Sequence, residues 1–406
     1  HVNGHRTLDL LVRSHEINLV RELRQAGYQT ALVGKNHTAD PETLAAMFDH
    51  HGQDEGKHAL ENPAHPAPPG SYLVGQEPAP LEDFRDYRNT SAALRWIDEE
   101  RDAEKPFFMW LNWNSPHPPY GVPAPFYGRI DRSTIELPPQ DDPATKALYQ
   151  TELACSYRMD KMTDEDWRDM VATYLEMVMF IDAEVARIHA HLAANGLLED
   201  TLIVLWSDHG DFAGEHQLPE KWDTSFYDCI TRVPWIIHDA SAPEENRIPA
   251  LVESIDILPT LLEKVGVTVP RGVQGKALGD LIRGDVTEVR DVVFCQGGQE
   301  PEMFDRVVPP ESKPRPCMAY QLKQDALYRV PEINIRAKMI RGVRWKYIYH
   351  LSGFEELYDL QADPHELSNL ASDLPHAEQL QTQRKRMIHK LVEAETVEPY
   401  QAYLES

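Results

Sequence analysis

The chain has 406 residues, of which 42% are hydrophobic and 26% are charged, as is ordinary for a globular protein of about two structural units. Its formal net charge of -26 argues against binding to nucleic acid or to anionic membrane surfaces, because such binding depends on basic patches. No stretch of the sequence approaches the ~20 consecutive apolar residues that a membrane-spanning helix needs.

The four cysteines, Cys155, Cys229, Cys295 and Cys317, lie far apart in the sequence and show no CxxC spacing. Their spacing therefore predicts neither a zinc motif nor a dense disulfide framework, although a single disulfide stays open. The chain opens on His1 without a methionine or a predicted strand, so we expect it to begin within a domain. A targeting segment would precede this residue, and the bacterial cytoplasm and the periplasm are both compatible compartments.

The first predicted unit is a helix over residues 14–26, capped by Ser14, followed by a short strand over residues 30–33. Lys35 and His37 follow this strand directly. Ligands collect at the carboxyl ends of strands in open α/β sheets, so a cation and an imidazole here indicate a binding site. The alternative is that Lys35 is a solvated loop residue, as most lysines are.

The second predicted unit places another histidine after a strand. Residues 50–80 are rich in Pro, Gly, His and Glu, which predicts a surface insertion. A helix over residues 89–104 then precedes a core strand over residues 107–111. His117 follows this strand between prolines, which would hold it in an extended loop where it could act as a general acid. The alternative is a loop histidine that packs on neighbouring Pro and Trp residues.

A long helix separates this unit from the next strand. Residues 126–161 are irregular and rich in proline, which predicts a long surface excursion. Thr163 then begins the helix, with Asp166 in the position of a capping-box residue, and Gly196 ends it. We therefore expect another helix–strand step of an α/β sheet here.

The most informative stretch is an apolar run over residues 202–206, which predicts a buried strand that ends in a polar turn. Asp208 and His209 in this turn offer an oxygen and a nitrogen ligand side by side. Lys221 follows shortly, as expected if an anion lies next to a metal ion. The alternative is an ordinary polar turn after a core strand.

The rest of the predicted main domain continues the alternation of strands and helices. A strand is predicted over residues 233–238, and a capped helix begins at Ser254 and ends at Gly266. Residues 292–295 are predicted as the last strand of the main sheet. Residues 1–300 therefore predict an α/β fold with a mainly parallel sheet between helices.

Residues 301–406 predict a small C-terminal α+β subdomain. Short β-like runs over residues 337–340, 345–350 and 356–359 are separated by turns. A charged helix follows over residues 375–393. This pattern is typical of a small antiparallel sheet with one helix.

Together these motifs resemble the sulfatases of the alkaline phosphatase superfamily. The matching motifs occur in the order that the family shows: residues 27–37, Ser115-Pro116-His117, Ser207-Asp208-His209-Gly210 with Gly214-Glu215-His216 and Lys221, residues 254–260 and residues 356–370. The family carries a Cys- or Ser-x-Pro-x-Arg motif whose first residue becomes formylglycine. None of the four cysteines is followed by Pro-x-Arg, so the resemblance implies a formylglycine upstream of His1.

The resemblance also implies a metal site. Asp208 and His209 would be two ligands of one divalent ion, to which the hydrated formylglycine would be coordinated when it attacks sulfur. Calcium prefers oxygen ligands, whereas the nitrogen of His209 also suits manganese or zinc. We expect calcium, with manganese and zinc as alternatives.

The other residue roles follow from the same resemblance. Lys35 and Lys221 would hold the sulfate oxygens as point charges. His117 would protonate the leaving alcohol, and His37 would hydrogen-bond the formylglycine and help to expel sulfate. For His216 a site role and a structural role are both open.

The sequence therefore predicts a sulfatase that hydrolyses a small-molecule or saccharide sulfate ester to an alcohol and inorganic sulfate. The alternatives are a phosphonate monoester or phosphodiester hydrolase of the same superfamily and an inactive truncated relative. We expect substrate selectivity to come from residues 50–80, 126–161 and 300–331. No nucleic acid partner and no membrane span are predicted, and a homo-oligomer stays open.

Overall fold

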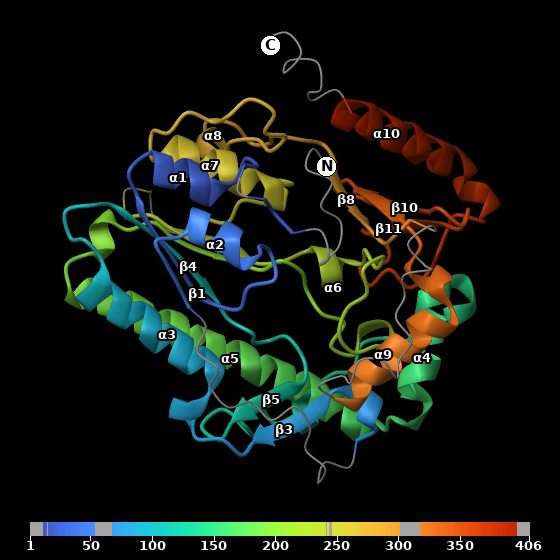
Figure 1. The fold of residues 1–406 in the computed structure, drawn as a ribbon. Coiled ribbons are helices and arrows are strands. Elements are labelled where there is room, and N and C mark those ends of the chain that lie inside the picture. The colour runs from blue at the N-terminus through green and yellow to red at the C-terminus, as the bar shows by residue number, and fades with distance from the viewer. Residues whose placement is uncertain are drawn as a thin grey trace.

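The computed structural model describes residues 11–395, except residue 14, residues 53–66, residue 241, residues 243–245 and residues 301–316. Figure 1 shows the fold, with the small C-terminal sheet and helix α10 at one side of the larger α/β part. None of the described helices combines the length and the apolar character needed to cross a membrane.

The centre of the α/β part is a parallel sheet of three strands. Strand β1 (Gln29–Gly34) lies between β2 (His50–Gly52) and β4 (Phe107–Asn112), and both neighbours run parallel to it. Ala31 and Leu32 are buried on opposite faces of β1, as the two-residue period of a strand requires. The predicted parallel α/β sheet is therefore confirmed.

Helices cover both faces of this sheet (Figure 1). On one face, α1 (Leu19–Gln25) and α2 (Pro41–Met47) pack Val20 and Met47 against the sheet. On the other face lie α3 (Arg85–Arg95), the π-helical turn η3 (Trp96–Glu100) and the long helix α5 (Asp164–Ala194). The sheet is thus enclosed between two helical layers, as the sequence predicts.

The ends of two helices test the predicted caps. Thr163 caps α5, and its capping box with Asp166 is present as predicted. The predicted cap Ser14 of the first helix lies outside the described residues. In the structure α1 begins later, at Leu19, because the side chain of Asn18 accepts a hydrogen bond from the Arg21 amide at 2.9 Å.

Strand β6 (Ile203–Trp206) follows α5 and carries the polar turn at its end. It pairs antiparallel with β7 (Trp235–His238). Four further helices complete this part of the chain and the approach to the C-terminal sheet: α6 (Asp228–Thr231), α7 (Ile257–Lys264), α8 (Gly279–Arg283) and α9 (Met318–Arg329).

Two segments that the sequence predicts as surface excursions contain core elements. Residues 50–80 include β2 and also β3 (Leu73–Glu77), which pairs with β5 (Tyr120–Pro123) and is largely buried. Residues 126–161 include α4 (Leu148–Tyr157). Helix α4 buries three side chains at helical spacing: Tyr149, Leu153 and Tyr157. The prolines around this segment conceal that spacing in the sequence.

The C-terminal sheet has four antiparallel strands in the order β11-β10-β9-β8. They are β8 (Val293–Gly297), β9 (Ala337–Arg341), β10 (Trp345–His350) and β11 (Glu355–Asp359). Helix α10 (Ala377–Glu395) packs Leu380 and Met387 on this sheet. The prediction that residues 292–295 close the main sheet is wrong, because β8 pairs with β9. The division of the chain at residue 300 stays a prediction.

Candidate active site

The ends of β1 and β4 are held in close contact, and this contact positions Lys35. Gly34 has a φ of 103°, and a Cβ atom there would lie 2.0 Å from the carbonyl oxygen of Asn112. Only glycine therefore fits at this crossing. The Asn112 side chain donates a hydrogen bond to the Lys35 carbonyl at 2.8 Å. The residues that leave these two strands are consequently brought to one edge of the sheet.

The loop that carries His117 is anchored by a buried carboxylate on α3. The oxygens of Asp86 accept hydrogen bonds from the backbone amides of Asn114 and Ser115, each at 2.8 Å. The amide of His117 then donates to the Asn114 carbonyl at 2.8 Å. The predicted loop histidine is thus held by the protein backbone and by a carboxylate that no sequence motif identifies.

His117 contacts Lys221 directly. Its Nδ1 donates to the carbonyl of Pro118 at 2.7 Å, and its Nε2 accepts a hydrogen bond from the Lys221 Nζ at 2.8 Å. Burial, followed by the charges of Lys221 and Lys35, lowers the pKa of His117 to about 3. The imidazole is therefore neutral near pH 7 in this state, with Nε2 as an acceptor.

Lys221 is paired with a buried carboxylate. Glu220 contacts the Lys221 Nζ at 3.1 Å through one oxygen and the Lys323 Nζ at 2.6 Å through the other. Burial opposes ionisation of Glu220, but Lys323 and Lys221 together lower its pKa to about 2. The ionised carboxylate holds both ammonium groups in place.

The loop between the polar turn and Lys221 has an unusual backbone. Residues with left-handed φ values follow one another closely: Ala213 at 43°, Gly214 at 97°, His216 at 54°, Gln217 at 57° and Glu220 at 62°. Such conformations are costly for residues other than glycine and persist where surrounding contacts enforce them. Here the amide of Phe212 donates to the Glu220 carbonyl at 2.8 Å, which folds Lys221 back toward the turn.

Asp208 and His209 lie at the end of β6, as predicted. The Nδ1 of His209 is hydrogen-bonded to the Gly210 carbonyl at 2.7 Å, which leaves Nε2 free to act as a ligand atom. This Nε2 lies 3.7 Å from Oδ1 of Asp208, whose side chain is 76% exposed. A carboxylate oxygen and an imidazole nitrogen on one face of a turn fit part of the ligand set of a divalent ion.

The six residues that the sequence predicts for the site lie within electrostatic reach of one another. Burial, then Lys35 and Lys221, lowers the pKa of His37, while Asp208 acts in the opposite direction. Burial, followed by Lys221, likewise lowers the pKa of Lys35. The rings of His117 and His209 are 6.2 Å apart. Lys221 thus contacts a neutral imidazole, and Lys35 acts on the same imidazole through its charge, which suits an anionic group.

Several residues of the site lack a signal in the sequence. Tyr320 on α9 donates a hydrogen bond to the Pro118 carbonyl at 2.8 Å, and its hydroxyl lies 3.4 Å from the His117 Nδ1. Lys323 comes from the same helix and binds Glu220. Helix α9 lies within residues 300–331, where we expect substrate selectivity. Its Tyr320 and Lys323 contact residues of the site.

Polar residues follow β1 and β4 of the parallel sheet and also strand β6, which pairs with β7 in a separate two-stranded sheet. The family model described as Sulfatase matches residues 9–267. The chain therefore belongs to the sulfatase family.

Two curated relatives illustrate the range of the family. The chain is 27% identical to the multifunctional alkaline phosphatase superfamily protein PehA of Trinickia caryophylli, over 89% of this chain and 76% of that protein. It is 24% identical to arylsulfatase K of Bos taurus, over 78% of this chain. The match spans 59% of that arylsulfatase, so this chain corresponds to little more than half of it.

Two solved structures share the fold. The phosphonate monoester hydrolase of Agrobacterium radiobacter superposes with a TM-score of 0.73 and 21% identity, over 97% of this chain and 83% of that one. A 2-O GAG sulfatase superposes with a TM-score of 0.73 and 22% identity, over 98% of this chain and 79% of that one. These similarities confirm the predicted fold.

Proposed function

We propose that this protein hydrolyses sulfate esters to an alcohol and inorganic sulfate. The observation that carries the proposal is the contact between Lys221 and His117, with Lys35 close by. Two cations and one neutral imidazole are thereby gathered at the end of a parallel sheet in a chain whose net charge is -26. A local excess of positive charge in an acidic protein favours binding of a small anion at this place.

Lys35 and Lys221 bind the non-bridging oxygens of the ester group. Glu220 fixes Lys221 before the substrate arrives, so little reorganisation is needed when charge develops on these oxygens. Because the ester is anionic, its binding offsets the positive charge of both lysines. The same charge therefore raises the pKa of His117 and allows its Nε2 to carry the proton that the leaving oxygen needs.

Asp208 and His209 would hold a divalent metal ion, which would supply further positive charge for the ester oxygens. We propose calcium, and the imidazole ligand makes manganese and zinc the alternatives. The proposal also includes a formylglycine nucleophile, which the family resemblance implies. His37, close to Lys35 and Asp208, would hydrogen-bond this nucleophile.

A second candidate is hydrolysis of phosphonate monoesters or phosphodiesters. Its support is specific: the phosphonate monoester hydrolase and the 2-O GAG sulfatase superpose with the same TM-score of 0.73. The nitrogen ligand offered by His209 suits this chemistry as well. The positively charged site would accept either oxyanion.

A direct comparison of the two ester classes tests the proposal. The complete gene product is assayed with 4-nitrophenyl sulfate and with a 4-nitrophenyl phosphonate monoester, which share the same leaving group. We expect the larger kcat/KM for the sulfate. A larger kcat/KM for the phosphonate would assign the protein to the second candidate, and the absence of turnover for both would refute hydrolysis by this site.

A further inference from the structure

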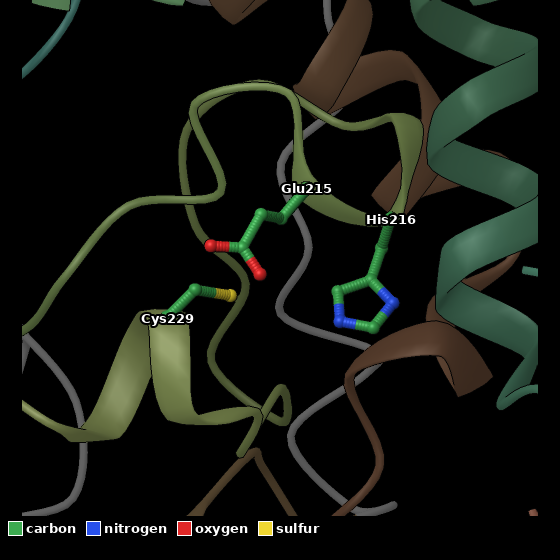
Figure 2. Close-up of side chains that lie close together, drawn as sticks. All are labelled: Glu215, His216 and Cys229. Carbon is green, nitrogen blue, oxygen red and sulfur yellow. The ribbon is translucent and has the colours of Figure 1, made fainter. Parts of the chain in front are cut away.

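Three side chains behind the candidate active site converge on one point. Glu215 and His216 come from the short turn η8 (Glu215–Gln217), and Cys229 comes from α6. Figure 2 shows the carboxylate, the imidazole and the thiol directed toward one another. One ligand atom from each lies within 4.8 Å of the other two. The proposed sulfatase chemistry uses none of these groups.

The imidazole of His216 is oriented as in a metal ligand. Its side chain is 1% exposed, and its Nδ1 is hydrogen-bonded to Oδ2 of Asp141 at 2.7 Å. A carboxylate that accepts the hydrogen bond from Nδ1 orients the ring and leaves Nε2 as the nitrogen that can bind an ion.

The position of His216 is rigid. Its ring stacks on Tyr227 with a centroid distance of 3.8 Å, and Lys146 lies 3.4 Å from the same Asp141 carboxylate. Among the described residues, no hydrogen bond is made to Nε2. An imidazole with one nitrogen on a carboxylate is the arrangement that proteins use to present the other nitrogen to a metal ion.

The other two groups complete a mixed set of donors. Cys229 supplies a thiol sulfur and Glu215 a carboxylate oxygen, each within 4.8 Å of a ring nitrogen of His216. The side chain of Glu215 is 37% exposed, which gives an ion a path from solvent.

We propose that Glu215, His216 and Cys229 bind one zinc ion, or a divalent transition-metal ion with similar ligand preferences. This site is distinct from the Asp208–His209 pair. Sulfur, nitrogen and oxygen donors together suit zinc, whereas calcium would require oxygen ligands. Zinc–ligand bonds of about 2.0–2.3 Å place two ligands of a tetrahedral ion about 3.3–3.8 Å apart. The three ligand atoms lie within 4.8 Å of one another, so the side chains would move together by about 1 Å when the ion binds.

A water molecule would complete a tetrahedral site. The Nδ1 of the half-exposed His365 lies 3.8 Å from Oε2 of Glu215 and marks the solvent side of the cluster. Because the Cys229 carbonyl accepts a hydrogen bond from the Asp211 amide at 3.1 Å, the ion would clamp α6 to the loop that ends at Lys221.

Cobalt binding tests the proposal without reference to hydrolysis. The purified protein is freed of metal with a chelator and titrated with Co²⁺, and the absorption band for charge transfer from thiolate to cobalt is recorded. We expect this band to saturate at one ion per chain and Zn²⁺ to displace it. Cys229→Ser should abolish the band, while Cys155→Ser, which changes the exposed cysteine, should retain it.

Two further variants make the outcome decisive. Asp141→Asn should weaken cobalt binding by about 10–100-fold, because it removes the carboxylate that orients His216. Asp208→Asn should keep the thiolate band even if hydrolysis is lost, which separates this inference from the proposed function. Cobalt binding without a thiolate band in the unmodified protein, or an undiminished band in folded Cys229→Ser, would overturn the proposal.

Discussion

At the scale of single residues, His117 determines how the candidate site would work. The imidazole is neutral because burial and two lysines oppose its protonation. Glu220 and the Pro118 carbonyl favour the imidazolium form but do not outweigh burial and the lysines, so an anion between the lysines is needed to make this imidazole a proton donor. The site would thus couple oxyanion binding to proton transfer at one nitrogen atom.

This coupling predicts a ligand-dependent pKa for His117. Without anions the imidazole should remain unprotonated down to about pH 4, because the pKa is lowered to about 3. Inorganic sulfate should raise this pKa by offsetting the charges of Lys35 and Lys221. Imidazole nitrogen NMR over a pH titration, with and without sulfate, measures the shift.

The control for this titration is Lys221→Gln, which removes the cation that donates to His117 Nε2. This variant should show a higher pKa for His117 than the unmodified protein before sulfate is added. If the unmodified protein titrates near the ordinary histidine value of about 6.5 and ignores sulfate, the electrostatic account of the site is wrong.

Sequence reasoning finds some of these residues and misses others for a physical reason. Lys35 follows the end of one predicted strand and His117 lies a few residues beyond another, so their place near a strand end is visible in the local sequence. Glu220 and Lys323 are 103 positions apart in the chain, and nothing in either segment reveals their contact. The ionised carboxylate that holds Lys221 is thus a product of tertiary structure.

At the scale of elements, the loop from Asp211 to Lys221 contributes both to the stability of the fold and to the position of Lys221 in the candidate site. Its left-handed residues are enforced by contacts, among them the hydroxyl of Tyr120, which accepts from the Glu220 amide at 2.6 Å and donates to Asp211 at 2.7 Å. The ion pairs of Glu220 lie at the end of this loop. We therefore expect the loop to loosen when Glu220 loses its charge.

The pH dependence of stability follows from this carboxylate. Its folded-state pKa of about 2 lies below the ordinary value of 4.5, so its contribution is complete above pH 4.5 and is lost as the pH falls toward 2. Glu220→Gln should therefore be destabilising at pH 6, and the difference from the unmodified protein should shrink toward pH 3. Urea unfolding across this range measures both free energies.

Glu199→Gln serves as the matched control, because Glu199 is exposed and precedes β6, whereas the polar turn of the site follows the other end of that strand. It should follow the unmodified protein at every pH. A constant difference between Glu220→Gln and the unmodified protein over the whole range would show that the Glu220 pKa is not lowered on folding.

The elements themselves divide into predictable and unpredictable ones. Strands β4 and β6 are almost entirely apolar, β1 has an apolar centre at residues 31–33, and helix α5 has a cap at Thr163, so their existence follows from the local pattern. The residues of a strand do not determine which other strand it pairs with. This is why the run at residues 292–295 was predicted in the wrong sheet, although a strand does form there.

At the scale of the whole molecule, a net charge of -26 surrounds a locally positive site. Small esters with a single charge experience little of this field, while a highly sulfated saccharide is repelled by it. Raising the ionic strength should therefore increase kcat/KM for a polysulfated oligosaccharide relative to a monosulfated aryl ester, because salt screens charges beyond about 10 Å at 0.1 M. A relative decrease with salt would instead indicate a basic surface that binds long polyanions.

The central claim is that the lysine–histidine contact serves sulfate ester hydrolysis. The most direct measurement is the release of inorganic sulfate from 4-nitrophenyl sulfate by the unmodified protein, by Lys221→Ala and by Lys161→Ala, which changes an exposed lysine. We predict release by the unmodified protein, a loss of about 10²–10³-fold in kcat for Lys221→Ala, and no change for Lys161→Ala. Equal rates of sulfate release by all three proteins would contradict the account.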